Sequence, residues 1–412
     1  MNTQNKEPNI RFNQFKELWK VVKLDSISQK VKSKNINNSF ENVLTNSAEF
    51  GIIPQRDFFD KDIANLKSLV SYYVVQPNDF VYNPRISNKA PVGPIKANFL
   101  NTTGVMSPLY YVFRTQNIDV FFLAKYFDSS YWHKFMKLNG DTGARSDRFA
   151  IKDSVFKEMP IPFPSIPEQS AIGSLLRTLD ELLASYKDNL ANYQSLKATM
   201  LSKMFPKAGQ SVPEIRLDGF KGEWEINKLN KYLTVSKKKN TKQQFGKEDV
   251  LSVSGEVGIV NQIQFQGRSF AGVSVEMYSI VETGNIVYTK SPLKANPYGI
   301  IKTNYGIPGI VSTLYAVYLP NENVFPGFVE RYFENDLRLN SYLKPLVNKG
   351  AKNDMKVSDE NALLGNVIFP KLEEQIAISD YFINLDKFIQ SHKDKISQLE
   401  TLKKKLLQDM FI

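Results

Sequence analysis

Few side chains in this chain are suited to catalysis. It has two histidines and no cysteine, and neither the phosphate-binding pattern GxxxxGK[ST] nor the dinucleotide pattern GxGxxG occurs. Asp57, Asp60 and Asp62 could bind a metal ion, but closely spaced carboxylates are more often solvated loop charges. His392 falls in an apolar helical row, so we expect it to pack. We predict no catalytic residue and no metal site.

Basic residues interleaved with aromatic and small polar residues are more informative. Lys and Arg outnumber Asp and Glu by 53 − 42 = 11, which favours a polyanionic partner. Lys and Arg neutralise phosphates, and Arg, Lys, Asn and Gln also read base edges. The residues predicted to bind DNA are Tyr82, Arg85, Lys89, Lys96, Arg114, Arg145 and Arg148 in the first half, and Lys237, Lys238, Lys239, Arg268, Tyr288, Lys290, Lys294, Lys302, Lys349 and Lys352 in the second.

The elements that must position these residues occur twice. Residues 166–205 and 372–411 align without a gap at an offset of 206 and are identical at 14 of 40 positions. A second phrase, PNIRFNQFKELWKVVKL from Pro8, returns from Pro213 as PEIRLDGFKGEWEINKL. Further matching segments lie between them. The whole chain is therefore a tandem repeat of about 205 residues, each copy a globular module followed by a long helix.

The two long segments carry apolar residues at seven-residue intervals, which predicts a coiled-coil seam in each. Each helix would be about 57 Å long at 1.5 Å per residue, and its longest available partner is the other copy. The residues predicted to pair the helices are Ile172, Leu175, Leu179, Leu182, Tyr186, Tyr193, Leu196 and Met200, with Ile378, Tyr381, Leu385, Phe388, His392, Leu399, Leu402 and Leu406.

The modules have mixed α/β character. Runs rich in β-branched and aromatic residues predict strands, and residues 118–138 and 326–346 have helical periodicity. We place the first module at residues 1–160, the first helix at 161–206, a linker and the second module at 207–366, and the second helix at 367–412. Apolar and aromatic residues outside the seam, such as Tyr131 and Trp132, or Phe388 and Phe411, are expected to face partner subunits.

The composition also bears on location. The absence of cysteine fits a reducing cytosol. No apolar run approaches the roughly 20 residues of a membrane span, and the amino terminus lacks the apolar core of a signal peptide. We expect a cytoplasmic protein that does not enter a membrane.

With this arrangement in view, the chain resembles the specificity subunit of a type I restriction-modification system. The resemblance is carried by IPFPSIPEQ at Ile161 and VIFPKLEEQ at Val367, each followed by a heptad helix, and by the repeated opening phrase. It implies two target recognition domains separated by two long antiparallel helices that form a coiled coil with internal pseudo-twofold symmetry. It also implies double-stranded DNA as ligand, with two modification subunits that use S-adenosylmethionine and two restriction subunits that use ATP and Mg²⁺.

The resemblance further implies that this chain binds no cofactor and has no activity of its own, in agreement with the search for catalytic residues. Because the two copies differ outside their shared segments, we expect an asymmetric, bipartite DNA target. Two other classes stay open. A stand-alone DNA-binding regulator would bind tightly without partners, and a catalytic methyltransferase or nuclease would need motifs that the sequence lacks.

Overall fold

A computed structural model describes residues 7–58, 66–142, 146–349 and 355–412. The chain divides into two compact units. Unit 1 comprises Met1–Lys187 and Asp394–Ile412, and unit 2 comprises Asp188–Lys393. Each unit therefore holds one module together with parts of both long helices. The boundaries at 160, 206 and 366 follow chain order instead, and they stay a prediction.

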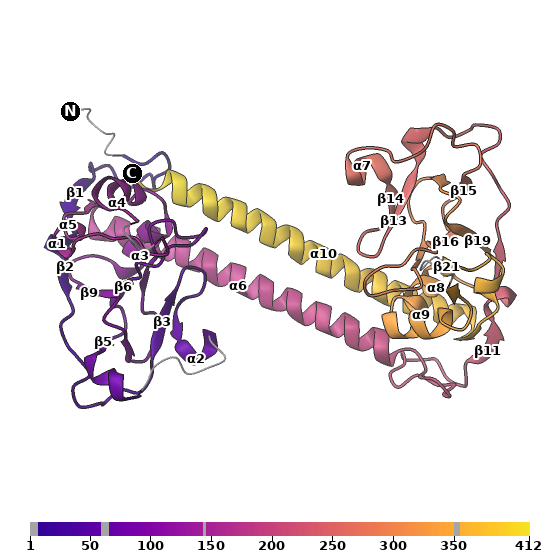
Figure 1. The fold of residues 1–412 in the computed structure, drawn as a ribbon, viewed down its shortest axis with the longest axis horizontal. Helices are drawn as coiled ribbons and strands as arrows, with labels where there is room; N and C mark the ends of the chain where they lie inside the picture. The colour runs from indigo at the N-terminus through magenta and orange to yellow at the C-terminus, as the bar shows by residue number, and fades with distance from the viewer. Residues whose placement is uncertain (1–6, 59–65, 143–145, 350–354) are drawn as a thin grey trace. The chain divides into compact units, whose positions relative to one another are not determined.

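Unit 1 begins with short strands and ends in a long helix (Figure 1). Its strands are β1 (Lys20–Lys23), β2 (Ser28–Lys30), β3 (Leu44–Ser47), β4 (Gly51–Pro54), β5 (Tyr73–Val75), β6 (Phe80–Tyr82), β7 (Ile95–Ala97), β8 (Gly104–Met106), β9 (Tyr111–Thr115) and β10 (Pro160–Phe163). Its helices are α1 (Leu24–Ile27), α2 (Gln55–Phe58), η1 (Leu66–Ser71), α3 (Val120–Asp128), α4 (His133–Asn139), α5 (Asp153–Phe156) and the start of α6 (Ile166–Lys203).

Unit 2 repeats most of this order. Its strands are β11 (Glu225–Lys228), β12 (Leu233–Val235), β13 (Leu251–Ser254), β14 (Gly258–Asn261), β15 (Ser279–Val281), β16 (Ile286–Tyr288), β17 (Ile301–Thr303), β18 (Gly309–Val311), β19 (Ala316–Pro320), β20 (Asn348–Lys349), β21 (Met355–Lys356) and β22 (Asn366–Phe369). Its helices are η2 (Leu229–Lys231), η3 (Lys247–Asp249), α7 (Gln262–Gln266), α8 (Pro326–Phe333), α9 (Asp336–Leu343), η4 (Asn361–Leu363) and the start of α10 (Leu372–Asp409).

The two modules share one sheet topology. Unit 1 has an antiparallel sheet of order β2-β9-β6-β7, and unit 2 has the equivalent order β12-β19-β16-β17. The pairs β1-β10, β3-β4 and β5-β8 recur as β11-β22, β13-β14 and β15-β18. The mixed α and β fold class predicted from the sequence is confirmed, with strand pairings that repeat along the chain.

The two segments predicted as helical are each divided in the structure. In unit 1, α3 starts where the Asp119 carboxylate accepts a hydrogen bond from Phe122 N at 2.9 Å. It ends where Ser129 Oγ donates to Tyr126 O, and α4 follows. In unit 2, the Asn335 side chain caps α9 after α8 has ended. Capping residues inside each apolar pattern therefore end one helix and start the next.

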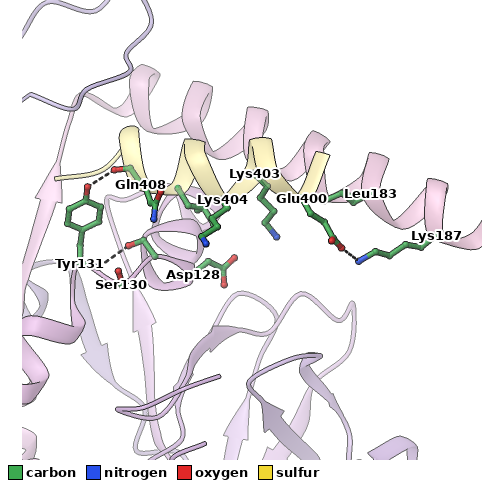
Figure 2. Close-up of a pocket in the computed structure, with 11 residues that line it drawn as sticks. Asp128, Ser130, Tyr131, Leu183, Lys187, Glu400, Lys403, Lys404 and Gln408 are labelled. Atoms are coloured by element: carbon green, nitrogen blue, oxygen red, sulfur yellow. Dashed lines mark hydrogen bonds and ion pairs between the residues drawn. The ribbon is translucent and has the colours of Figure 1, made fainter. Parts of the chain in front are cut away.

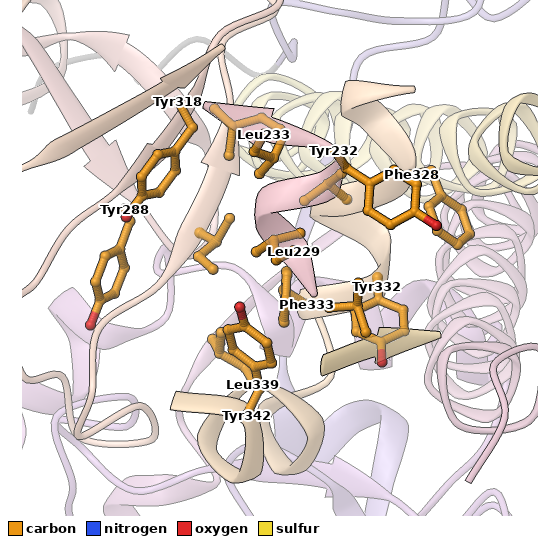
Figure 3. Packing of buried hydrophobic residues seen from close by; sticks show 14 of the residues in the cluster. Leu229, Tyr232, Leu233, Tyr288, Tyr318, Phe328, Tyr332, Phe333, Leu339 and Tyr342 are labelled. Atoms are coloured by element: carbon orange, nitrogen blue, oxygen red, sulfur yellow. The ribbon is translucent and has the colours of Figure 1, made fainter. Parts of the chain in front are cut away.

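Each core includes the end of a long helix. In unit 1, Phe411 lies 5.4 Å from Phe122 between ring centroids, beside the buried Trp132. In unit 2, Phe205 packs against Trp224 and the rings of α8, and Figure 3 shows the aromatic part of this core. Trp132 and Phe411 are only 2% exposed, so the expectation that they face a partner is wrong. Trp132 and Phe411 are instead part of the apolar core of unit 1.

The long helices α6 and α10 pair within each unit. In unit 1, Leu179 and Leu183 pack with Leu399. The partner numbers fall along α10 as those of α6 rise, from Asp180–Lys403 to Lys187–Glu400, so the pairing is antiparallel. In unit 2, the ring of Tyr193 stacks on Phe388 with centroids 5.8 Å apart and meets His392 edge-on.

The first predicted row of the seam faces inward. Its members are buried or half-buried throughout: Ile172, Leu179, Tyr186, Tyr193 and Met200 of α6, with Ile378, Leu385, His392, Leu399 and Leu406 of α10. Tyr381 is half-buried at the edge of the unit 2 core.

The second row needs a correction, because the structure places it one residue further along. Leu175, Leu182, Leu196 and Leu402 are 37–45% exposed, and Phe388 is 55% exposed despite its stacking. The inward positions are Leu176, Leu183, Leu190 and Lys197 of α6 with Met204 just beyond its end, and Phe382, Ile389, Ile396 and Lys403 of α10 with Met410 just beyond its end. Adjacent leucines at 175–176 and 182–183 fit either register. Lys197 and Lys403 in the inward row make that row look less apolar in the sequence than the exposed one.

A matched pair of variants tests this register. Leu183→Ala removes a side chain that is 6% exposed and should destabilise unit 1 by about 2–4 kcal/mol, because the truncation leaves a cavity. Leu182→Ala removes one that is 42% exposed and should cost less than about 1 kcal/mol. Urea denaturation followed by circular dichroism measures both, and equal losses would contradict the register.

The repeated opening phrase is held on the first turn of a long helix. Arg11 donates from Nε and Nη2 to the two carboxylate oxygens of Glu168, at 2.7 and 2.9 Å. In unit 2, Arg216 makes the same two bonds to Glu374, both at 2.8 Å. The glutamate side chains are 2% and 4% exposed. This pairing explains why the Arg of the phrase and the Glu of the helix recur together.

Glu168→Gln should lower the stability of unit 1 on the order of 3 kcal/mol, because it removes the buried counter-charge of the Arg11 guanidinium, 13% exposed, and leaves it only the more distant, exposed Glu7. The control is Glu181→Gln, whose side chain is 68% exposed on the same helix and should change stability little. Thermal unfolding measures both. Equal melting temperatures for the two variants would show that the bidentate pair does not hold the phrase.

Candidate nucleic-acid interface

A basic turn follows the first strand of the main sheet in both modules. In unit 1 it is residues 32–35, KSKN, and in unit 2 it is residues 237–240, KKKN. We refer to these two segments as the basic turns. Each begins where the sheet's edge strand ends: Val31 N donates to Val112 O at 2.9 Å, and Ser236 N donates to Val317 O at 2.8 Å.

A buried asparagine shapes each basic turn. The Asn35 side chain donates to Phe40 O and accepts from Phe40 N, at 2.8 and 3.1 Å. Asn240 makes the same two bonds to Phe245 at the same distances. The asparagines are at most 2% exposed and hydrogen-bonded to backbone atoms. They therefore fix the backbone conformation of the turn that carries the preceding lysines.

The lysines of the turns differ in what they contact. Lys32 and Lys237 are exposed and form no ion pair within the described residues. Lys34 Nζ lies 3.2 Å from the centre of the Tyr73 ring, and Lys239 Nζ donates to Ser279 Oγ at 2.8 Å. Lys238 pairs with Glu282 at 2.9 Å. The free ammonium groups at 32 and 237 are therefore the ones suited to a phosphate.

Sequence reasoning missed Lys32 and Lys34. The signal was present, because residues 32–35 align with 237–240 at the offset of 205 that relates the opening phrases. A run of three lysines attracts attention, whereas the KSK spacing in unit 1 does not. Aligning the repeats first would have found both.

Module 1 brings two predicted arginines together. Arg85 and Arg148 face each other in an antiparallel bridge, held by Phe149 N donating to Pro84 O at 2.8 Å. Arg85 is exposed, and Lys89 in the next loop pairs with Glu49 at 2.7 Å. Among the described residues the buried Arg148 Nε has no hydrogen-bond partner, and it lies 4.0 Å from the Asp147 carboxylate. A hollow of about 610 Å³ beside them is lined by Pro84, Phe149 and neighbouring residues.

Several predicted cations are neutralised by carboxylates. Arg114 donates from Nε and Nη2 to Asp79 at 2.7 and 2.9 Å, and this hydrogen-bonded pairing raises the pKa of the guanidinium. Lys96 pairs with Asp128 at 2.6 Å. In unit 2, Lys290 pairs with Asp359 at 2.7 Å. These cations carry less net charge toward a ligand than their exposure suggests.

Three predicted residues are buried, which is a correction to their proposed role. Tyr82 is 4% exposed and its hydroxyl donates to Val92 O at 2.9 Å. Tyr288 is fully buried and donates to Tyr298 O at 2.5 Å. Lys302 is 8% exposed and pairs with Glu330 at 3.2 Å. Both tyrosines lie in strands that are buried at every position, and they join the apolar cores of their units.

The remaining predicted residues are exposed or lie outside the description. Arg268 is exposed beside Phe270, with the guanidinium 4.6 Å from the ring centre, and Lys294 is exposed. Arg145 and Lys352 lie outside the described residues, and so does the side chain of Lys349.

Solved structures provide the comparison. An S subunit of a type I restriction-modification system from M. genitalium aligns with TM-score 0.58 and 16% identity, over 98% of this chain and 99% of that one. This chain has the fold of a type I restriction-modification S subunit. The resemblance expected from the duplicated helices is thereby confirmed at the level of the fold.

Two other solved structures are similar over nearly the full chain. The HsdS subunit of Thermoanaerobacter tengcongensis aligns with TM-score 0.45 and 14% identity, over 95% of this chain and 96% of that one. A chain from a study titled as the assembly and conformational transition of the type I R-M system aligns with TM-score 0.47 and 13% identity, over 97% and 99%. No protein-family model and no curated protein matches the sequence.

Across residues 7–58, 66–142, 146–349 and 355–412, no group of three or more His, Cys, Asp or Glu could hold a metal ion. The helices in those ranges are too short or too polar to span a bilayer.

If the basic turns of this S-subunit fold contact phosphates, Lys32→Ala and Lys237→Ala should each weaken binding to duplex DNA of any sequence. Each should also reduce the slope of log affinity against log salt by about 1, because one phosphate contact is lost. Fluorescence anisotropy at several salt concentrations measures both effects. The control is Lys207→Ala, an exposed lysine paired with Glu214 outside the modules. Unchanged slopes in both variants would remove the turns from the interface.

Proposed function

We propose that this chain is the DNA specificity subunit of a type I restriction-modification complex. In this role it binds an asymmetric, bipartite DNA target and docks two modification subunits and two restriction subunits in the cytoplasm. The observation that carries the proposal is the duplicated S-subunit fold, in which each copy presents its own basic surface.

The basic turns support a shared contact to the DNA backbone. They are held by equivalent bonds in the two modules, and phosphate contacts position a protein without reading sequence. The same frame therefore suits any duplex, and differences in recognised bases must come from elsewhere in the modules.

Differences between the modules support two unlike half-sites. Module 1 places Arg85 and Arg148 together, whereas the offset of 206 that aligns β6 with β16 puts Ser291 at the position of Arg85. The neighbouring Lys290 is neutralised by Asp359. Module 2 instead presents Arg268 stacked on Phe270 after α7. Arginine reads guanine edges in pairs of hydrogen bonds, so arginines at different places favour different base sequences.

The proposal assigns the chemistry to partner subunits. S-adenosylmethionine would be used by the modification subunits, and ATP and Mg²⁺ by the restriction subunits, so this chain would bind no cofactor and catalyse no reaction. Its contribution would be the choice of the DNA sequence at which the partners act.

Mapping methylated adenines in the source genome tests the proposal. Deleting the gene should abolish methylation at one split sequence and leave other methylated sequences intact. Restoring it with Arg85→Ala should relax one half of that sequence, and Arg268→Ala the other half, by about 1–3 kcal/mol of discrimination each. An unchanged methylation pattern after deletion would refute the proposal. Tight binding by the isolated chain would favour a stand-alone regulator instead.

A further inference from the structure

One carboxylate in unit 1 joins three elements. Asp180 of α6 accepts a hydrogen bond from Lys125 Nζ of α3 and lies 2.5 Å from Lys403 Nζ of α10. Lys125 also pairs with Asp128 at 3.1 Å, at the end of α3. The module helix is thus bonded to both long helices through a single side chain.

Unit 2 contains the same cluster with the long helices exchanged. Asp386 of α10 pairs with Arg331 of α8 at 2.7 Å and with Lys197 of α6 at 2.6 Å. Glu334 pairs with both cations at 2.6 Å. All four positions correspond to those of unit 1 at an offset of 206, and each conserves the sign of its charge. Independent divergence of the modules has not removed the cluster from either.

The clusters are partly withdrawn from water. Lys125 and Arg331 side chains are 10% and 8% exposed, and Asp180 and Asp386 are 30% and 35% exposed. Burial by itself would raise the pKa of Asp128. The nearby charges of Lys96 and Lys125 lower that pKa by more, so its net shift is downward. Charges at this depth contribute little to overall stability, yet they oppose any arrangement that separates them. They therefore favour one placement of the module helix over its alternatives.

A close backbone approach provides a second fixed point on the same helix face. A Cβ added at Gly173 of α6 would lie 2.8 Å from Phe122 N of α3. In unit 2 the small residue is on the module side: a Cβ at Gly327 of α8 would lie 2.4 Å from the hydroxyl of the buried Ser379 on α10. Phe122 and Lys125 are three residues apart and share a face of α3. The ion cluster and the glycine contact together hold α3, and likewise α8, at two points, so the helix cannot rotate about one of them without breaking the other.

A hollow lies beside the unit 1 cluster. It has a volume of about 640 Å³ and is lined by Asp128, Tyr131, Lys403 and Leu407, among others (Figure 2). The Tyr131 hydroxyl donates to Gln408 O at 2.5 Å at its edge. The ion cluster therefore adds to the apolar contacts of α3 with Phe411 at a place where the surface is open.

We propose that Asp180 and Asp386 are positioning residues that each orient one module on the helix pair within its unit. Because the inference rests on the proposed function for its effect on DNA, Asp180 would govern recognition of the half-site read by module 1, and Asp386 that read by module 2. Neither residue is proposed to touch DNA.

Distance measurements test the positioning without DNA. The chain has no cysteine, so spin labels can be placed at Leu138→Cys with Ser185→Cys in unit 1, and at the corresponding Lys344→Cys with Ser391→Cys in unit 2. Asp180→Asn should shift or broaden the distance distribution of the first pair only, and Asp386→Asn that of the second only. Asp180→Glu keeps the charge and should show most of the native distance distribution. This variant keeps the test decisive if Asp180→Asn folds poorly. Unchanged distributions in both neutral variants would overturn the inference.

The effect on recognition is measured with the assembled complex. Asp180→Asn should reduce discrimination against substrates with an altered module 1 half-site at least 10-fold, measured as the ratio of methylation rates, and Asp386→Asn should do the same for the other half-site. Glu181→Gln on the exposed face of α6 should match the native chain. Shifted distances with native discrimination at both half-sites would overturn the link to recognition. A native complex without sequence preference would refute the proposed function, while the distances would still decide the positioning.

Discussion

Burial of a Met-Phe pair at the end of each long helix is the contact on which both units depend. Met410 and Phe411, which directly follow α10, lie in the core of unit 1, and Met204 and Phe205, which directly follow α6, lie in that of unit 2. Each of these side chains is at most 2% exposed. A module therefore does not complete its core with its own segment alone, because it needs the end of a long helix. This requirement draws both helices into each unit and brings α6 and α10 together.

Once the helices are paired, the remaining features follow from repetition. The Arg-Glu pair that holds each opening phrase, the asparagine of each basic turn and the ion cluster of each module helix all occur twice with equivalent partners. The shared bonds hold the frame, and the parts between them are free to diverge. Such a division suits a protein that must change what it recognises while keeping the same assembly.

Much of this was predictable because duplication can be read directly from the sequence. The long helices, the mixed modules and the recurring Arg and Glu were visible as identities at a constant offset. The seam register was not, because adjacent leucines such as Leu182 and Leu183 fit either row, and tertiary packing decided between them. Burial of Tyr82 and Tyr288 was also missed, since a tyrosine suits a surface or a core and the sequence does not show that both faces of β6 and β16 are covered. Ion clusters depend on contacts between distant elements, which spacing along one element does not show.

The sequence segments that make up each unit determine when that unit can fold during synthesis on the ribosome. Unit 2 is a continuous stretch, Asp188–Lys393, whereas unit 1 draws on residues from both ends of the sequence, with Ile10 N donating to Asp409 O at 2.8 Å. Synthesis proceeds from the amino terminus, so the nascent first module waits with an unfilled core until residues 394–412 have been added. The later-made half of the polypeptide can therefore finish folding before the half that was made first.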